Sequence, residues 1–121
     1  MTTQSSEILF QAKESLVLPQ PITAYFTADK GDIEAFFQCF TENAVVQDEG
    51  KTYRGLMAIK EWKANASTEY QYTSVPFASE VKDEKIIVTS RVTGNFPGSP
   101  VDLRFFFQLI GDKIASLEIV L

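Results

Sequence analysis

The sequence predicts an α+β fold, a cone-shaped roll in which about three N-terminal helices pack on one face of a curved, mainly antiparallel sheet. Two observations lead to this prediction. Up to about residue 65, apolar residues recur every three to four positions, whereas further along the chain they alternate with polar residues. The alternating runs are also separated by short turn signals, which join neighbouring antiparallel strands.

The length and composition fit one globular domain. The chain has 121 residues, of which 45% are hydrophobic and 22% are charged. Residues 1–18 are predicted to form an N-terminal tail or a short helix over residues 7–15. Pro19 and Pro21 interrupt that segment, so the single domain is expected to cover residues 19–121.

Three helices are predicted to open the domain. They cover residues 21–28, 33–40 and 54–65, and Asp32 is the expected N-cap of the second. The apolar residues of each helix fall on one side at helical spacing: Ile22, Tyr25 and Phe26 in the first, Ile33, Phe36, Phe37 and Phe40 in the second, and Leu56, Ile59 and Trp62 in the third. Such stripes need a large apolar surface to cover them, and the predicted sheet provides it.

Five strands are predicted, one short strand before the third helix and four long ones after it. They cover residues 44–48, 69–80, 85–93, 101–110 and 113–121. Residues 49–51 are predicted to form a turn, and residues 95–100 a longer loop within the meander of long strands. Pro76 indicates a bulge or an edge position in the first long strand, because proline cannot donate to a neighbouring strand.

The charge balance argues against two classes of partner. Lys and Arg total 11 against 16 Asp and Glu, and the densest cationic group is Lys60 and Lys63 beside Trp62. Binding to a nucleic acid backbone normally needs a larger basic patch. The sequence also has no run of about 18 apolar residues and no positively charged start of a signal peptide. We therefore expect neither nucleic acid nor membrane as a partner, and a cytoplasmic location.

The chain has no histidine and one cysteine, Cys39. This excludes an intrachain disulfide, the common zinc sites and any nucleophile paired with histidine. The acidic residues are not spaced as in a calcium-binding loop. We expect no cofactor and no metal.

Three segments carry a resemblance to a known family. Residues 30–36 (KGDIEAF), 40–48 (FTENAVVQD) and 53–59 (YRGLMAI), together with the order of predicted elements, resemble the nuclear transport factor 2-like superfamily. The resemblance is to its SnoaL-like polyketide cyclase and ketosteroid isomerase branch and covers about residues 21–121. It implies a cystatin-like roll around a hydrophobic pocket, but this scaffold hosts isomerases, cyclases, dehydratases and binding modules.

The resemblance carries over only part of the isomerase site. The general base at the end of the first strand corresponds to Asp48, whereas the family's tyrosine falls at or next to Ala24, so that Tyr25 matches with a slip of one residue. The family's protonated carboxylic acid falls near Phe105, which cannot donate a proton. The histidine of the cyclase branch is missing. The resemblance thus implies a base without its usual helpers.

Asp48 is the first catalytic candidate, because a desolvated carboxylate can remove a proton alpha to a carbonyl. Tyr25 and Tyr53 are the neutral donors proposed beside it, the latter because it is close in sequence. Strand alternation places Val46 on the same face as Asp48 but leaves open whether that face is the interior. Capping of the strand end is the alternative role for Asp48.

A ligand pocket is expected in the cone, although the same residues could equally form a solid core. Its predicted lining is Phe36, Phe40, Val46, Trp62, Tyr72, Phe105, Phe107 and Leu117, with Phe77 added as a further aromatic ring. Strand alternation puts four other residues on the outer face of the sheet, where they are expected to form a homodimer interface: Arg104, Phe106, Gln108 and Glu118.

Two functions are consistent with these observations. The first is a SnoaL-like protein whose pocket binds a small hydrophobic molecule, as a cofactor-free isomerase, cyclase or dehydratase acting alpha to a carbonyl. The second is a non-catalytic binding or assembly domain, which the missing histidine and the missing second acid favour.

Overall fold

A computed structural model of the chain describes residues 16–29 and 31–121. The predicted α+β class is confirmed, whereas the helix predicted over residues 7–15 lies outside the described residues. In order, the described elements are α2 (Gln20–Ala28), α3 (Ile33–Gln38), β1 (Phe40–Asp48), β2 (Lys51–Arg54), α4 (Gly55–Glu69), β3 (Tyr72–Lys82), β4 (Lys85–Gly94), β5 (Val101–Ile110) and β6 (Lys113–Val120).

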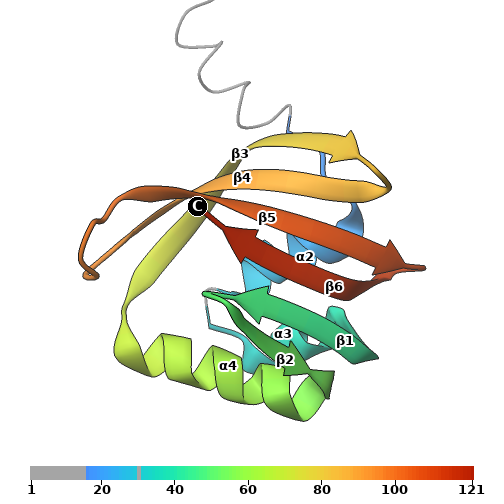
Figure 1. The fold of residues 1–121 in the computed structure, drawn as a ribbon, viewed down its shortest axis with the longest axis horizontal. Helices are drawn as coiled ribbons and strands as arrows, with labels where there is room; N and C mark the ends of the chain where they lie inside the picture. Colours follow the sequence, from blue (N-terminus) through green and yellow to red (C-terminus); the bar gives the residue numbers. More distant parts are fainter. Residues whose placement is uncertain (1–15, 30) are drawn as a thin grey trace, which may run out of the picture.

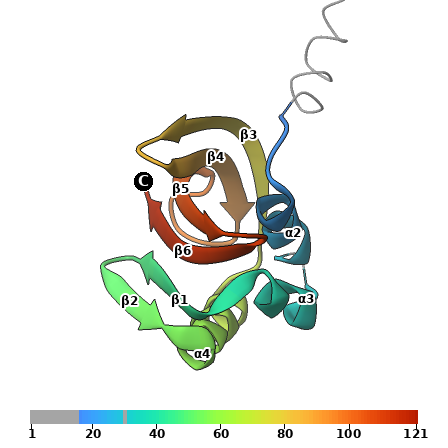
Figure 2. The ribbon, with the colours of Figure 1, turned by 90° about the vertical axis from the view of Figure 1, so that its right-hand side faces the viewer.

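The six strands form one curved sheet in the order β2-β1-β6-β5-β4-β3. Every neighbouring pair is antiparallel except β1 and β6, which are parallel. Figures 1 and 2 show the helices gathered on one side of this sheet, with α2 and α3 adjacent and α4 running beside β1 and β2. The helices therefore cover the inner face, and no other described element covers the outer face.

Strand pairing decides which side chains face the helices. Asp48 of β1 lies beside Ile119 of β6, which pairs with Phe105 of β5, which in turn pairs with Val88 of β4. Residues directly opposite one another in a sheet share a face, and Phe105 and Val88 are buried. Asp48 thus belongs to the inner row, which answers the question that strand alternation left open.

Several predicted boundaries were wrong near the first strand. The second helix ends at Gln38, and Phe40 already opens β1, because this aromatic residue packs equally well from a strand. Strand β2 was missed: its four residues are too few to show alternation, and pairing with β1 stabilises them. The turn before it uses Gly50, whose φ of 77° suits glycine.

The later elements fit the predictions more closely. Helix α4 extends to Glu69, four residues beyond the predicted end at Asn65, and β3 accordingly begins at Tyr72. Both alternatives for Pro76 hold, because β3 is an edge strand and its register with β4 shifts between Pro76 and Ala78. Among the described residues, no helix combines the length and the apolar character needed to cross a membrane.

The two faces of the sheet differ as expected, with one correction. Phe105, Phe107 and Leu117 are buried in the core, whereas the predicted outer residues Arg104, Gln108 and Glu118 are exposed. Phe77 does not line the interior: it is 46% exposed and lies under the guanidinium of Arg91. The bulge after Pro76 interrupts the alternation on which that assignment rested.

Candidate functional site

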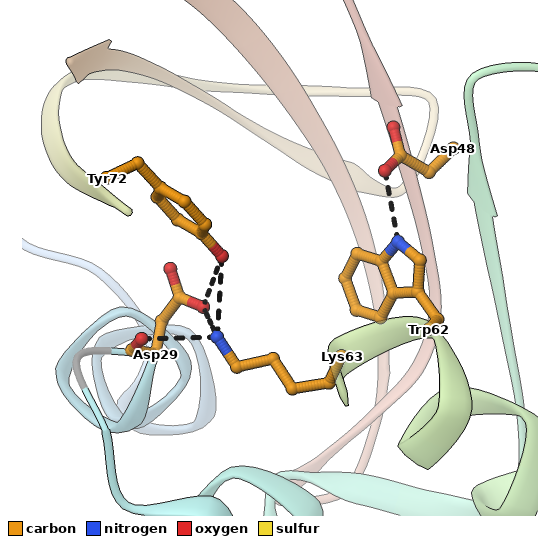
Figure 3. A network of polar contacts seen from close by, with 5 residues as sticks. All are labelled: Asp29, Asp48, Trp62, Lys63 and Tyr72. Atoms are coloured by element: carbon orange, nitrogen blue, oxygen red, sulfur yellow. Dashed lines mark hydrogen bonds and ion pairs between the residues drawn. The ribbon is translucent and has the colours of Figure 1, made fainter. Parts of the chain in front are cut away.

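The carboxyl group of Asp48 is held inside the roll by a tryptophan of α4. The indole N–H of Trp62 donates to Oδ2 of Asp48 at 3.0 Å, and the carboxyl is only partly exposed (Figure 3). Burial raises the pKa of Asp48 above its ordinary value, and the hydrogen bond from Trp62 opposes this effect. The group is therefore a somewhat stronger base than a carboxylate in water.

A second polar cluster lies deeper in the fold. Lys63 Nζ forms an ion pair with Oδ1 of Asp29, contacts the main-chain oxygen of Asp29 at 3.2 Å and lies 3.4 Å from the Tyr72 hydroxyl. The same hydroxyl donates to Oδ1 of Asp29 at 3.3 Å (Figure 3). We call these three residues the Lys63 cluster. Its charged side chains are only 6% (Lys63) and 11% (Asp29) exposed.

One turn of α4 serves both carboxylates. Trp62 and Lys63 are consecutive residues, and the first contacts Asp48 of β1 while the second contacts Asp29, the C-cap residue of α2. Figure 3 shows the two side chains leaving the helix toward different partners. The position of α4 against the sheet thus fixes both polar groups at once.

Tyr25 places a hydroxyl group in the same interior. Its ring is 3% exposed and packs against aromatic neighbours of α2, α3, β1 and β5. Burial raises the pKa of Tyr25 well above its usual range, and the negative charges of Asp29 and Asp48 add to this. Among the described residues this hydroxyl has no hydrogen-bond partner, so it remains a neutral donor inside an apolar shell.

The third catalytic candidate, Tyr53, contacts Trp62, the residue that donates to Asp48. Its half-buried ring packs on Trp62, with 6.2 Å between the ring centroids and 38° between the planes. Tyr53 is therefore placed to support the indole that binds Asp48.

Open space is found at the edge of the roll. A cleft of about 370 Å³ is lined by Asp29, Gly31, Ile33, Lys63, Tyr70, Gln71 and Tyr72. A smaller hollow of about 140 Å³ adjoins Asp48 and Glu118 near the β1–β2 turn. Of the eight residues predicted to line a pocket, Tyr72 lies on the larger cleft. The other seven are buried members of the aromatic and aliphatic core: Phe36, Phe40, Val46, Trp62, Phe105, Phe107 and Leu117.

Sequence reasoning overlooked Lys63 and Asp29 as site residues. The available signal was the position of Lys63, which follows Ile59 and Trp62 on the side of α4 that carries the apolar residues. A lysine on a stripe that faces the core needs a buried partner. Its partner, Asp29, is 34 residues away in the sequence, so nothing local indicated it.

No group of three or more histidine, cysteine, aspartate or glutamate side chains in residues 16–29 and 31–121 could hold a metal ion. The single thiol, Cys39, is buried and donates to the main-chain oxygen of Ala35 at 3.4 Å. Burial raises the pKa of Cys39, which suits a packing role better than a reactive one.

A curved sheet with helices on its inner face and acid groups inside defines a protein of the nuclear transport factor 2-like type. The family model of the SnoaL-like domain matches residues 22–117, and the chain belongs to this family. No match was found among curated proteins.

Three solved structures illustrate the relationship. A candidate polyketide cyclase of Sinorhizobium meliloti is 39% identical, with a TM-score of 0.82 over 85% of this chain and 95% of the other. A ketosteroid isomerase-like protein of Catenulispora acidiphila, solved with trimethylamine, is 18% identical, with a TM-score of 0.75 over 87% of each chain. A cystatin-fold protein of Novosphingobium aromaticivorans is 18% identical, with a TM-score of 0.69 over 84% of this chain and 96% of the other. The two more distant relatives share the fold alone.

Proposed function

We propose that this SnoaL-like protein binds a small, mostly apolar carbonyl compound between its helices and its sheet and transfers a proton at the carbon alpha to the carbonyl, without a cofactor. The observation that supports this most is the carboxyl of Asp48, which lies on the inner face, partly buried and held by the indole of Trp62.

Asp48 is the base in this proposal. Oδ2 accepts the hydrogen bond from Trp62, and in this proposal the carboxylate takes the proton from the alpha carbon while the bonding electrons move toward the carbonyl oxygen. Returning the proton to a second carbon completes an isomerisation. In a cyclisation the enolate carbon attacks a second carbonyl, and the alkoxide formed there takes the proton back from Asp48. A positioned base contributes about 10²–10⁴ in rate.

Tyr25 is the donor to the developing enolate oxygen. Its hydroxyl stays protonated because its pKa is raised, and it already lies within the field of Asp48. Removing a donor to such an oxygen typically costs about 10²–10³ in rate. Tyr53 acts through Trp62 as a positioning residue.

The test is solvent deuterium incorporation into a panel of cyclic enones and aryl ketones, followed by proton NMR. We expect Asp48→Asn to slow the exchange by at least about 100-fold, because asparagine cannot accept the proton. Glu42→Gln is the matched control, since Glu42 is an exposed carboxylate of the same strand. Equal exchange by wild type and Asp48→Asn would contradict the role of Asp48.

A binding or assembly domain is the second candidate, and one observation favours it. The aromatic rings of Tyr25, Phe36, Phe105 and Phe107 contact one another in the interior, so the core is well filled. This alternative predicts that a ketone binds in an NMR titration while no deuterium enters it, in wild type as well as in Asp48→Asn.

We also propose a homodimer through the outer face of the sheet, around Arg104, Phe106, Gln108 and Glu118. Support comes from the apolar surface there, where Phe106 is half-buried and Phe77 is exposed, and from the mixture of opposite charges that a two-fold axis can pair. Sedimentation should give a dimer for wild type and a monomer for Phe106→Asp. Met57→Asp, which alters an exposed apolar residue of α4 and not of the outer sheet face, should remain a dimer.

A further inference from the structure

The Lys63 cluster has no task in the proposed proton transfer, yet it forms the floor of the larger cleft. We infer that this cleft is a binding site for a neutral ligand that presents a carbonyl oxygen next to a hydroxyl group, a hydroxy-carbonyl compound. Tyr72 and Lys63 donate to the carbonyl oxygen, and the free oxygen of Asp29 accepts from the hydroxyl. The inference deepens the proposed function, on which it rests: the hydroxy-carbonyl group bound in this cleft is a second polar group of the substrate, separate from the reacting carbonyl that Tyr25 binds.

Two contacts within the cluster are long enough to be exchanged for a ligand. The Lys63–Tyr72 and Tyr72–Asp29 distances are 3.4 Å and 3.3 Å, near the limit for hydrogen bonds, whereas Lys63 and Asp29 also form an ion pair. A ligand can therefore accept one hydrogen bond from the Tyr72 hydroxyl and one from the Lys63 ammonium group, while the Lys63–Asp29 ion pair stays in place.

The charge of the cluster selects a neutral ligand. Lys63 and Asp29 cancel one another, so a carboxylate entering the cleft meets the Asp29 carboxylate and an ammonium group meets Lys63. Tyr72 adds a neutral donor, because burial, followed by the charge of Asp29, raises its pKa far above neutrality. The cluster thus offers two donors, Tyr72 and Lys63, beside one acceptor, the Asp29 carboxylate. A hydroxy-carbonyl compound has the complementary groups, since its carbonyl oxygen accepts and its hydroxyl donates.

The walls of the cleft suit a small, partly apolar body. Ile33 of α3 is 43% exposed, an unusual position for a residue of its helix stripe, and it lines the cleft together with Tyr70. A volume of about 370 Å³ lies at the lower end of the range for ligand pockets, which is about 300–1,000 Å³. A single ring with a short polar side chain is a suitable size.

The probe for this inference is α-hydroxyacetophenone, compared with acetophenone, benzoate and benzylamine in an NMR titration of the ¹⁵N-labelled full chain. We expect the hydroxyketone to bind most tightly, about three- to tenfold better than acetophenone, because it makes one further hydrogen bond. The amide resonances of Gly31, Gln71 and Tyr72 should shift. Tyr72→Phe should weaken binding by a similar factor, and Lys60→Met, which alters an exposed lysine of the same helix, should not.

Three results would overturn the inference: benzoate or benzylamine binding as tightly as the hydroxyketone, shifts confined to another part of the surface, or an unchanged affinity in Tyr72→Phe. Because Tyr72→Phe keeps the ring, circular dichroism and the unfolding midpoint identify a variant that has failed to fold. In that case Ile33→Ala, which shortens a partly exposed wall residue of the cleft, is titrated in its place with the same expected loss. Binding of the hydroxyketone without deuterium exchange would reject the proposed catalysis and leave this site standing. Exchange with a KM unaffected by Tyr72→Phe would do the reverse.

Discussion

Residues 16–29 and 31–121 contain two cation–carboxylate pairs that differ mainly in their access to water. Lys63 and Asp29 are 6% and 11% exposed on the inner side of the sheet, whereas Arg91 and Asp102 are 59% and 41% exposed on the outer face. Each cation also lies over an aromatic ring, Lys63 at 5.0 Å from the centre of Phe36 and Arg91 at 5.7 Å from that of Phe77. The local chemistry is similar and the surroundings are opposite.

The difference shows where polar groups in this fold are costly. On the outer face, water and salt screen the charges, so that removing either partner costs little stability. In the interior each charge has lost its hydration shell and depends on its partner. Polar groups kept in such a place despite their cost are more informative about function than those on the surface.

The largest effect is expected when the inner pair loses one partner. Lys63→Met should lower the free energy of unfolding by about 3–5 kcal/mol, because it leaves the Asp29 carboxylate buried without a counter-charge. Urea unfolding measures this, with Lys60→Met as the exposed control. The double variant Lys63→Met, Asp29→Asn should recover most of the loss. A double variant as unstable as the single one would mean that the cost lies in packing and not in charge.

Removing a second interior polar group should raise the free energy of unfolding, whereas Lys63→Met should lower it. Tyr25→Phe removes a buried hydroxyl that has no partner among the described residues, so the free energy of unfolding should rise by about 1 kcal/mol. The same variant should lose exchange activity if Tyr25 donates to the enolate. A clear loss of stability in urea would show that the hydroxyl is hydrogen-bonded in the native protein.

The carboxyl of Asp48 should make stability depend on pH. Its pKa in the folded protein is raised, chiefly by burial, whereas the unfolded chain titrates near about pH 4. Between these two values the folded state binds more protons than the unfolded state, so this group's contribution to stability falls as pH rises through the window. Unfolding of wild type and Asp48→Asn from pH 3.5 to 7 should diverge there in favour of the variant; parallel curves would mean that Asp48 is fully hydrated.

The smallest effect is expected on the outer face. The hydrogen bond from Arg91 lowers the pKa of Asp102, but both side chains are well exposed to solvent. Arg91→Gln and Asp102→Asn should each leave the thermal midpoint within experimental error of wild type. A large drop in either would indicate that the proposed homodimer interface extends over the Arg91–Asp102 pair, and the drop should then be absent when the melt is repeated in the Phe106→Asp background.

The helices and long strands were predictable because their signals are local. Apolar spacing along α2 and α4 and alternation along β4 and β5 depend on neighbours within one element, and these elements appear where the sequence placed them. Short β2 and the early start of β1 were not predictable, because pairing between strands stabilises them and their own residues carry no clear pattern.

The sequence by itself determined the family, the α+β class and the presence of an acid at the end of the first strand. Only the tertiary structure decided that Asp48 faces inward, since this follows from its pairing beside Ile119 at the far end of the chain. The same holds for Lys63, whose partners lie on α2 and β3. The periodicity of a helix or strand fixes the face of that element on which a side chain lies. Tertiary packing then determines which distant residues that face contacts.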